Sequence, residues 1–258
     1  MNRVKFGRTR REKKKDENDQ QKSGQFFSGH ELRKIFLKKI RSRGVRPLPT
    51  FILEDGLSLS SDALIAGVDE VGRGPLAGPV VASAVIVNRS LCSESILCTI
   101  DDSKRLSPKN RNMALTMIRK IAITGTGFAD RSEIDELNIF WASMLAMERA
   151  IEEVETKLDR PLDAVLVDGN QLPNLKCPGY AIVKGDTKSI SIAAASIVAK
   201  TTRDDFMLRM ASIHPEYGWE KNMGYGTQQH LDALKKFGPT KQHRRSFRPV
   251  LEALKTSY

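Results

Sequence analysis

The stretch IAGVDEVGRGPLAGP, residues 65–79, constrains this chain more than any other. Its first apolar residues lead into two adjacent carboxylates, Asp69 and Glu70. A Gly-Arg-Gly turn at 72–74 follows at once, and a second apolar run occupies 80–87. Two apolar runs joined by a glycine-rich turn predict an antiparallel β-hairpin with the acids at its tip.

The acids at this tip have two interpretations. Gly72 and Gly74 permit positive φ angles and place no Cβ atom between the backbone and a ligand. Adjacent carboxylates supply the oxygen ligands that a divalent cation prefers. Asp and Gly are equally common in solvated turns. These residues alone leave a metal site and a plain turn open.

Charge divides the chain into two parts. The formal net charge is +11, from 42 Lys/Arg and 31 Asp/Glu. Residues 1–50 contain 16 Lys/Arg and 5 Asp/Glu, whereas the remainder contains 26 of each. The basic excess therefore belongs to the amino-terminal segment. We interpret this segment either as a disordered, solubilising tail or as an arm that binds nucleic acid.

We expect residues 1–60 to form an extension in front of a globular domain at 61–258. Apolar residues at helical intervals predict an amphipathic helix near 29–42, which docks on the domain, with a membrane surface or nucleic acid as alternatives. Pro, Gly and Ser residues at 44–62 indicate a linker. Gln25-Phe26-Phe27 either packs against the helix or serves as a peptide for a replication clamp or another partner.

Cysteine usage and hydropathy indicate the cellular compartment. The three cysteines are an odd number without a C-x-x-C pair, which argues against a disulfide framework or a zinc site. The longest apolar run, 75–87, is too short to span a bilayer, and the amino terminus lacks the apolar core of a secretion signal. We expect a monomeric cytoplasmic protein that has no membrane partner.

Further carboxylates stand at the ends of predicted elements. A short apolar strand over 163–168 places Asp168 at its carboxyl end, where open α/β sheets form their sites. A helix over 189–213 has an apolar stripe, and Asp204 and Asp205 flank its continuation almost symmetrically, so periodicity does not choose between them. The other predicted elements are strands 124–129 and 180–183 and helices 108–122, 138–158 and 228–237.

The carboxyl-terminal part is basic. No acid occurs between Ala233 and Leu251, whereas this interval holds Lys241, His243, Arg244, Arg245 and Arg248. A basic patch of this kind suits a phosphate backbone. The alternative is a solvated, salt-bridged end of the fold.

These motifs resemble those of the ribonuclease HII family. The opening motif falls on 65–79, an Ala-Lys-x-x-Arg-Asp pattern falls on 199–204, and the resemblance covers about residues 63–250. It implies a ribonuclease H-like α/β fold: a five-stranded mixed sheet with three antiparallel strands, flanked by helices, and a helical carboxyl-terminal extension. Of the two acids that periodicity leaves open, the resemblance selects Asp204.

The resemblance also implies a reaction. Ribonuclease HII cuts the RNA strand of RNA–DNA hybrids and single ribonucleotides embedded in duplex DNA, and it leaves 5′-phosphate and 3′-hydroxyl ends. Four clustered carboxylates repel one another unless a cation lies among them. Two Mg²⁺ or Mn²⁺ ions about 3.5–4 Å apart suit phosphodiester hydrolysis. The implied catalytic and metal-binding residues are Asp69, Glu70, Asp168 and Asp204.

Substrate contacts follow from the same resemblance. It implies that Gly72-Arg73-Gly74 reads the ribose 2′-hydroxyl, which distinguishes RNA from DNA. It implies that Tyr225 stacks on the neighbouring deoxyribose. Lys104, Lys184 and the basic carboxyl-terminal residues are expected to hold phosphates.

Two other functions and one geometric question stay open. The alternatives are a nucleic-acid-binding protein without catalysis and another nuclease of the same fold, such as ribonuclease HIII. Adjacent residues of a strand face opposite sides of a sheet. Asp69 and Glu70 can therefore share one site only if the backbone twists at 71–72.

Overall fold

The structure, a computed structural model, describes residues 48–256. The helix expected near 29–42 and the Gln25-Phe26-Phe27 segment lie outside the described residues, so both stay predictions. Within residues 48–256, every helix falls short of the length and apolar character that a membrane span requires.

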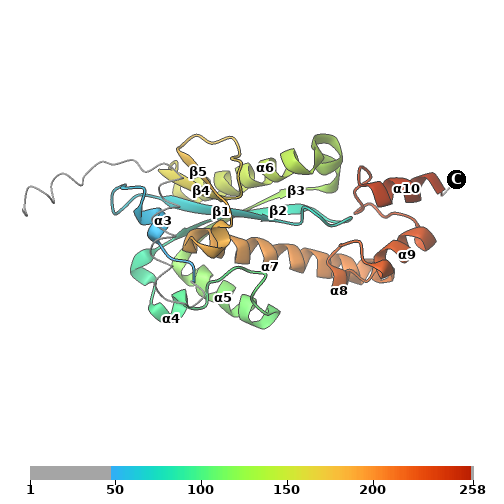
Figure 1. The fold of residues 1–258 in the computed structure, drawn as a ribbon, viewed down its shortest axis with the longest axis horizontal. Coiled ribbons are helices and arrows are strands. Elements are labelled where there is room, and N and C mark those ends of the chain that lie inside the picture. Colours follow the sequence, from blue (N-terminus) through green and yellow to red (C-terminus); the bar gives the residue numbers. More distant parts are fainter. Residues whose placement is uncertain (1–47, 257–258) are drawn as a thin grey trace, which may run out of the picture.

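The described residues form one mixed five-stranded sheet in the order β3-β2-β1-β4-β5 (Figure 1). Three strands are antiparallel neighbours, and β4 and β5 run parallel to β1. This arrangement confirms the expected sheet. The strands are β1 (Ile65–Val71), β2 (Val80–Val87), β3 (Ala122–Ala129), β4 (Ala164–Asp168) and β5 (Gly179–Ile182).

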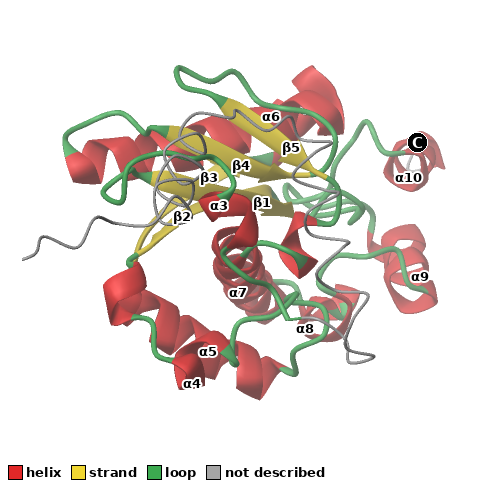
Figure 2. Cartoon of the chain, turned by 60° about the vertical axis from the view of Figure 1, so that its left-hand side comes forward, coloured by secondary structure: helices red, strands yellow, loops and turns green. Residues whose placement is uncertain are grey.

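Helices cover both faces of the sheet (Figures 1 and 2). α6 (Arg131–Leu158) packs on one face of β1–β3, and α7 (Ile190–Ile213) packs on the other. α5 (Pro108–Ile121) lies against the outer side of α7. Each face therefore has its own apolar core, one centred on α6 and one between α7 and α5.

α7 lies close to the sheet because its first half is lined by small buried residues. Ala193, Ala194 and Ala195 are fully buried. Gly67 of β1 approaches the helix so closely that a Cβ atom there would lie 2.1 Å from the carbonyl carbon of Ser191. Ser189 caps the helix, since its Oγ accepts a hydrogen bond from Ile192 N at 3.1 Å. The start of α7 is thus fixed against β1.

β1 and β2 form the predicted antiparallel pair, but a tight turn does not join them. Eight residues, 72–79, connect the two strands. They form a loop that the carboxyl-terminal part contacts, with Gly78 N donating to Gln242 O at 2.9 Å and Leu76 N donating to Gly224 O at 2.8 Å. The expectation of a tight turn was wrong because the glycine spacing does not reveal these distant partners.

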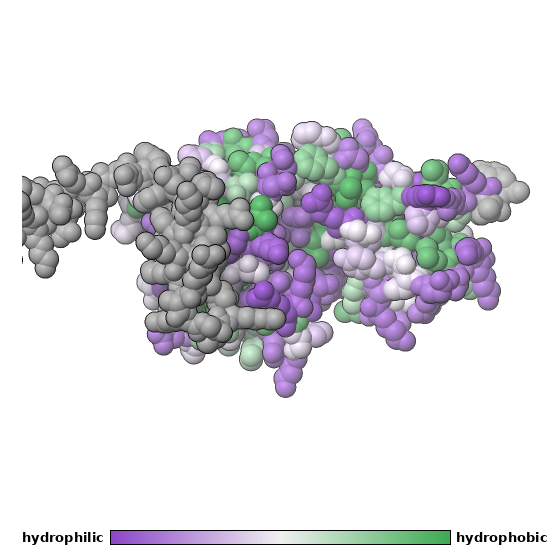
Figure 3. Space-filling model, in the orientation of Figure 1, coloured by the Kyte–Doolittle hydropathy of each residue, from purple (hydrophilic) through white to green (hydrophobic). Residues whose placement is uncertain are grey.

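The carboxyl-terminal extension is helical, as expected. It contains α8 (Trp219–Asn222), α9 (Gln228–Phe237) and α10 (Arg248–Thr256), and it projects beyond one end of the sheet (Figure 1). Its core includes Trp219, Leu234 and Val250. Figure 3 shows apolar residues at the surface between α9 and α10, whereas most of the described surface on this face is hydrophilic.

Residues 48–57, expected to belong to a linker, instead pack on the domain. They include α3 (Ile52–Asp55), and Leu53 and Leu57 are buried against Leu166 of β4 and Ile182 of β5. Thr50 N donates to Lys188 O at 3.0 Å, just before α7. The linker expectation is therefore wrong for this part, because two leucines one helical turn apart find an apolar face of the sheet. The remaining short helix is α4 (Glu94–Leu97).

Glu54 of α3 gives the first prediction. It is buried, Oε1 accepts hydrogen bonds from Ser189 Oγ at 2.7 Å and Ser191 N at 3.2 Å, and Oε2 has no partner among the described residues. Burial raises the pKa of Glu54, against the opposing effect of the Ser189 hydrogen bond. Between the ordinary and the raised pKa, the folded protein holds more protons than the unfolded chain, so stability falls as pH rises through this window.

Glu54→Gln removes this titration. The thermal midpoint of the variant, relative to that of wild type, should therefore increase as pH rises from about 4 to about 7. Thermal unfolding monitored by circular dichroism across this range measures the difference. Glu136→Gln, at an exposed position of α6, serves as the control and should follow wild type. Parallel curves for Glu54→Gln and wild type would contradict a buried, protonated Glu54.

Candidate metal centre and active site

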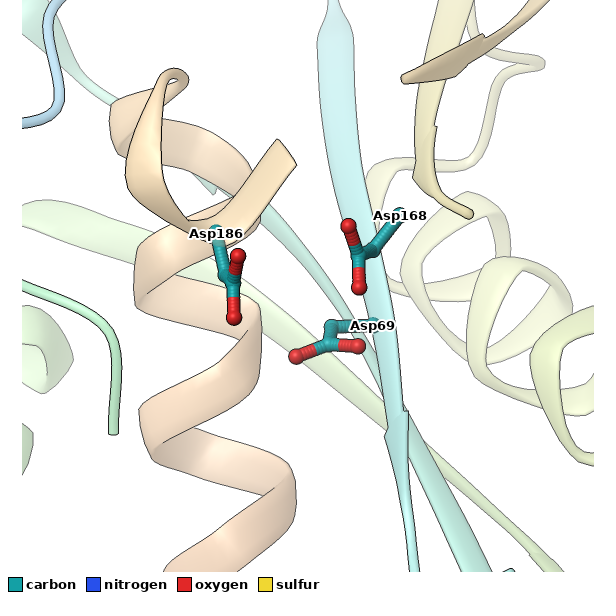
Figure 4. Close-up of side chains that lie close together, drawn as sticks. All are labelled: Asp69, Asp168 and Asp186. Atoms are coloured by element: carbon teal, nitrogen blue, oxygen red, sulfur yellow. The ribbon is translucent and has the colours of Figure 1, made fainter. Parts of the chain in front are cut away.

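Three carboxylates meet at the carboxyl ends of β1 and β4. Oxygen atoms of Asp69, Asp168 and Asp186 all lie within 4.8 Å of one another, and Figure 4 shows the side chains pointing toward a common centre. Asp69 belongs to β1, Asp168 ends β4, and Asp186 lies in the 3-10 turn Gly185–Thr187 before α7. Asp69 and Asp186 are buried.

Strand pairing explains why these acids meet. β1 and β4 are parallel with Val68 opposite Val167, so Asp69 and Asp168 reach the same edge of the sheet. β5 pairs with β4 in parallel, and its chain continues into the turn that carries Asp186. Gly185 N donates to Asp168 Oδ1 at 2.6 Å, which holds that turn against the end of β4.

Glu70 faces the other side of the sheet. It lines a cleft of about 550 Å³ together with Phe140 of α6 and Asp168. Its Oε1 lies 3.4 Å from Arg73 Nη1. The geometric question therefore has an answer without a twist at 71–72: Asp69 and Glu70 do face opposite sides, and Asp168 at the strand end borders both.

Burial and mutual repulsion act on the cluster. Burial raises the pKa of Asp69 well above its ordinary value, and the charges of Glu70 and Asp168 raise it further. Burial, followed by the charge of Asp168, raises the pKa of Asp186. Burial also raises the pKa of Glu70, against the opposing charge of Arg73. Without a cation, ionising these acids together is unfavourable.

The donor set fits a hard divalent cation. Carboxylate oxygens are the ligands that Mg²⁺ and Mn²⁺ accept. Asp69, Asp168 and Asp186 bring such oxygens close enough to surround one ion, and Glu70 adds a fourth carboxylate next to Asp168. A cation among them would offset the repulsion that raises the pKa values.

Asp204 lies outside this cluster. Its oxygens bind Lys200 Nζ at 2.6 Å and Arg111 Nη1 at 3.1 Å. Asp204 therefore pairs with two basic side chains. Asp186, and not Asp204, lies next to the other acids in the structure. Sequence reasoning missed Asp186, although the signal was present: it follows the strand at 179–182 just as Asp168 ends its neighbour.

Two buried arginines hold the 72–79 loop. Arg203 donates to the carbonyl oxygens of Pro79 (3.0 Å), Ala77 (3.1 Å) and Met223 (2.9 Å). Arg244 donates to those of Gly78 (3.0 Å), Arg73 (2.9 Å) and Gly72 (2.5 Å). Neither side chain is accessible to solvent. Gly72 is required here, since its φ is +94° and a Cβ atom would lie 2.2 Å from Arg203 Nε.

The basic carboxyl-terminal patch is consequently smaller than expected. Arg244 and His243 are buried, so neither can contact a phosphate at the surface. His243 Nε2 lies 3.0 Å from His230 Nε2, and Thr240 N donates to His243 Nδ1 at 2.9 Å. Only Lys241, Arg245 and Arg248 of the predicted group are exposed.

Tyr225 lies beside the Gly-Arg-Gly residues. A Cβ atom on Gly74 would be 3.4 Å from Tyr225 Cε1. Tyr225 is 47% exposed, and its carbonyl oxygen lies 2.9 Å from His230 Nδ1. Tyr225 is therefore a supported surface aromatic and not a core residue.

Both predicted lysines border the acidic cluster. Lys104 Nζ lies 3.8 Å from Asp186 Oδ2 while most of its side chain is exposed. Burial lowers the pKa of Lys104, but the charges of Asp69 and Asp186 outweigh this effect and raise it overall. Lys184 is exposed two residues before Asp186 and has a left-handed backbone with φ 56°.

Comparison with known proteins agrees with this geometry. Residues 66–250 match the ribonuclease HII family. The chain is 50% identical over 196 residues to ribonuclease HII of Paramagnetospirillum magneticum, covering 76% of this chain and 96% of the relative. It is 52% identical over 195 residues to ribonuclease HII of Rhodospirillum rubrum, covering 75% and 88%.

Solved structures share the fold. Ribonuclease H2 of Pyrococcus horikoshii has a TM-score of 0.58 at 24% identity and covers 74% of this chain and 97% of that one. Bst-RNase HIII in complex with Mn²⁺ has a TM-score of 0.62 at 16% identity, with coverage of 76% and 70%. The sheet order, the carboxylate cluster and these matches lead to one assignment. The chain belongs to the ribonuclease HII family and is a ribonuclease H hydrolase.

Proposed function

We propose that this protein is a metal-dependent endonuclease that cuts the RNA strand of RNA–DNA hybrids and single ribonucleotides in duplex DNA, leaving 5′-phosphate and 3′-hydroxyl ends. The observation that carries the proposal is the position of the buried carboxylate cluster next to a glycine-containing loop and an exposed tyrosine. The carboxylates would bind the metal ions that hydrolysis requires, and the loop and the tyrosine ring would contact the sugars. A nucleic-acid-binding protein without catalysis has no use for three acids at one sheet edge.

Asp69, Asp168 and Asp186, with Glu70, are the residues that would hold Mg²⁺ or Mn²⁺. When bound, such ions activate water and stabilise the leaving oxygen of a phosphodiester. The chain's own contribution is to fix the acids. Their carboxylates are set by the sheet edge and by the Gly185–Asp168 hydrogen bond before any substrate arrives.

Other residues orient the nucleic acid. The backbone of Gly72, Arg73 and Gly74 can approach a ribose closely, and the two buried arginines keep it from moving. Tyr225 can pack on a sugar that lacks a 2′-hydroxyl. Lys104 and Lys184 supply positive charge for the phosphates on the cluster's open side.

We also propose that the protein acts as a monomer in the cytoplasm, in the removal of ribonucleotides from DNA. One structural relative is the Archaeoglobus fulgidus ribonuclease HII in a complex with PCNA, with a TM-score of 0.56 at 24% identity over 70% of this chain and 93% of that one. A clamp contact through Gln25-Phe26-Phe27, and nucleic-acid binding by basic residues 1–50, stay proposals for this chain.

A cleavage assay tests the function and the acid set together. A duplex with one embedded ribonucleotide should be cut in Mg²⁺ or Mn²⁺ by wild type. Asp69→Asn and Asp186→Asn should each lose at least about a hundredfold in rate, because each removes a metal ligand. Asp204→Asn should stay within about tenfold, because Asp204 only binds Arg111 and Lys200. An inactive wild type would refute the proposed function. An inactive Asp204→Asn together with a fully active Asp186→Asn would show that Asp204, and not Asp186, is the metal ligand.

Metal and pH should act jointly on stability. Raised pKa values at Asp69 and Asp186 mean that the metal-free protein loses stability as pH rises above their ordinary values. Metal requires the ionised carboxylates, so its stabilisation grows with pH and reaches about 2.7 kcal/mol at a hundredfold excess over Kd. Calorimetry should therefore give a larger metal-induced rise in thermal midpoint at about pH 8 than at about pH 5. Asp168→Asn should show a smaller rise, and equal shifts in both proteins would remove Asp168 from the site.

Tyr225→Ala should slow cleavage of the single-ribonucleotide duplex about tenfold, the scale of losing one aromatic stack. Its loss on a continuous RNA–DNA hybrid should be smaller, because a hybrid has no ribose–deoxyribose junction to read. The thermal midpoint should change little, since the ring is half exposed. Initial rates on both substrates decide this, with Tyr225→Phe as the control that keeps the ring. Equal losses of rate on both substrates, together with a lowered thermal midpoint, would show that Tyr225 is structural.

A further inference from the structure

α6 contains a strained kink beside the proposed site. Asn138 has φ 66° and ψ 167°, which is not helical and belongs to a region that is essentially confined to glycine. Its Oδ1 accepts hydrogen bonds from Phe140 N at 2.9 Å and Trp141 N at 3.3 Å, so the helix restarts directly after the kink. Backbone strain of this kind clusters at functional sites.

The restart presents two aromatic rings. Phe140 and Trp141 pack edge to face, with ring centroids 5.0 Å apart and planes at 79°. Trp141 is 58% exposed, whereas Trp219, the other tryptophan of the chain, is fully buried. Trp141 therefore contributes little to the core and leaves a large aromatic surface open to a ligand.

Phe140 borders the cleft that Glu70 and Asp168 share. The cleft has a volume of about 550 Å³. One side is apolar and comes from α6, and the other side is formed by the segment after β4. Met144 and Met147 of α6 continue the apolar side, and the amides of Asn170 and Gln171 face it.

Trp141 is not part of this lining, but its ring packs on that of Phe140, which is. Residues seven apart share a helix face, and Glu148 on the face of Trp141 accepts a hydrogen bond from Asn174 N at 2.9 Å. That face of α6 therefore follows the segment between β4 and β5, which begins at Gly169 in the lining of the cleft. In Figure 1 this segment runs alongside α6.

We propose that Phe140 and Trp141 form a stacking site for a nucleobase of the strand that is cut, next to the scissile phosphate. The proposal rests on the function proposed above and extends it. Asp168 belongs both to the carboxylate cluster and to the cleft, so a strand with a phosphate at the cluster continues past these rings. Arg73 in the lining is already paired with Glu70 at 3.4 Å, so the cleft does not favour a second phosphate beside Asp168, whereas a neutral base suits an apolar wall faced by amides. Stacking accepts every base, so the site carries no sequence preference.

Tryptophan fluorescence tests the contact directly. The protein is titrated in EDTA, where no cleavage occurs, with a duplex that holds one ribonucleotide. Because Trp219 is buried, Trp141 should dominate any change, and binding should quench the wild-type emission. Trp141→Phe should bind the duplex, as followed by anisotropy of a labelled strand, with no change in emission. An equal change in emission in Trp141→Phe would overturn the proposal.

Kinetics supply a second, independent readout. Trp141→Ala should raise KM about tenfold with kcat unchanged, and Trp141→Phe should stay within about threefold of wild type. Leu91→Ala is the matched control, an exposed apolar residue that follows β2 at the end of the sheet away from the acids. A wild type that cleaves, with Trp141→Ala unchanged in KM, would overturn the stacking site alone. A wild type that neither binds nor cleaves would overturn the proposed function as well.

Discussion

The candidate site depends on two guanidinium groups that solvent does not reach. Arg203 from α7 and Arg244 from the carboxyl-terminal extension donate six hydrogen bonds to backbone carbonyls, five of them in the 72–79 loop. The loop has three glycines and two prolines among its eight residues. The prolines fix φ at two positions only, so these bonds give the rest of the loop its one shape. Burial lowers the pKa of Arg244 to about 9, because the charged guanidinium loses its contact with water there. Lysine could not replace either residue, because its single ammonium lacks the planar fork that reaches several carbonyls at once.

The same region holds opposite charges that are paired only in part. Arg203 and Arg244 donate to carbonyl oxygens and not to the acids, whereas Arg73 lies 3.4 Å from Glu70 and Lys104 lies 3.8 Å from Asp186. Both arrangements cost stability, and the rigid sheet with its two apolar cores supplies the stability that holds them. The carboxylates thereby stay grouped at one edge of the sheet, and the loop backbone keeps one shape.

Local patterns predicted what local interactions determine. The alternation of apolar runs gave β1, β2 and β4, and adjacency to the ends of these strands pointed to Asp69 and Asp168. The resemblance, and not periodicity, selected Asp204, which in the structure pairs with Lys200 four residues away and with Arg111 93 residues away and lies outside the cluster. The sequence places Asp186 just after a predicted strand, but only the parallel pairing of that strand with β4 brings it to the other acids. Arg244 was expected to contact a phosphate because its neighbours in the sequence are basic. It is instead buried against the 72–79 loop, a distant contact that those neighbours do not reveal.

The alternation of side chains along β1 divides the candidate site between the two faces of the sheet. Asp69 and Glu70 must point to opposite faces of the sheet. The face covered by α7 holds the acidic cluster and Lys104, and the face covered by α6 holds the cleft that Phe140 borders. A residue inside a strand could serve only one of these sides. Asp168 serves both because β4 ends there and Gly169 follows with φ +109°, so no further strand residue blocks either direction. Because Asp168 ends a short strand, it borders both the carboxylate cluster and the cleft, which lie on opposite faces of the sheet.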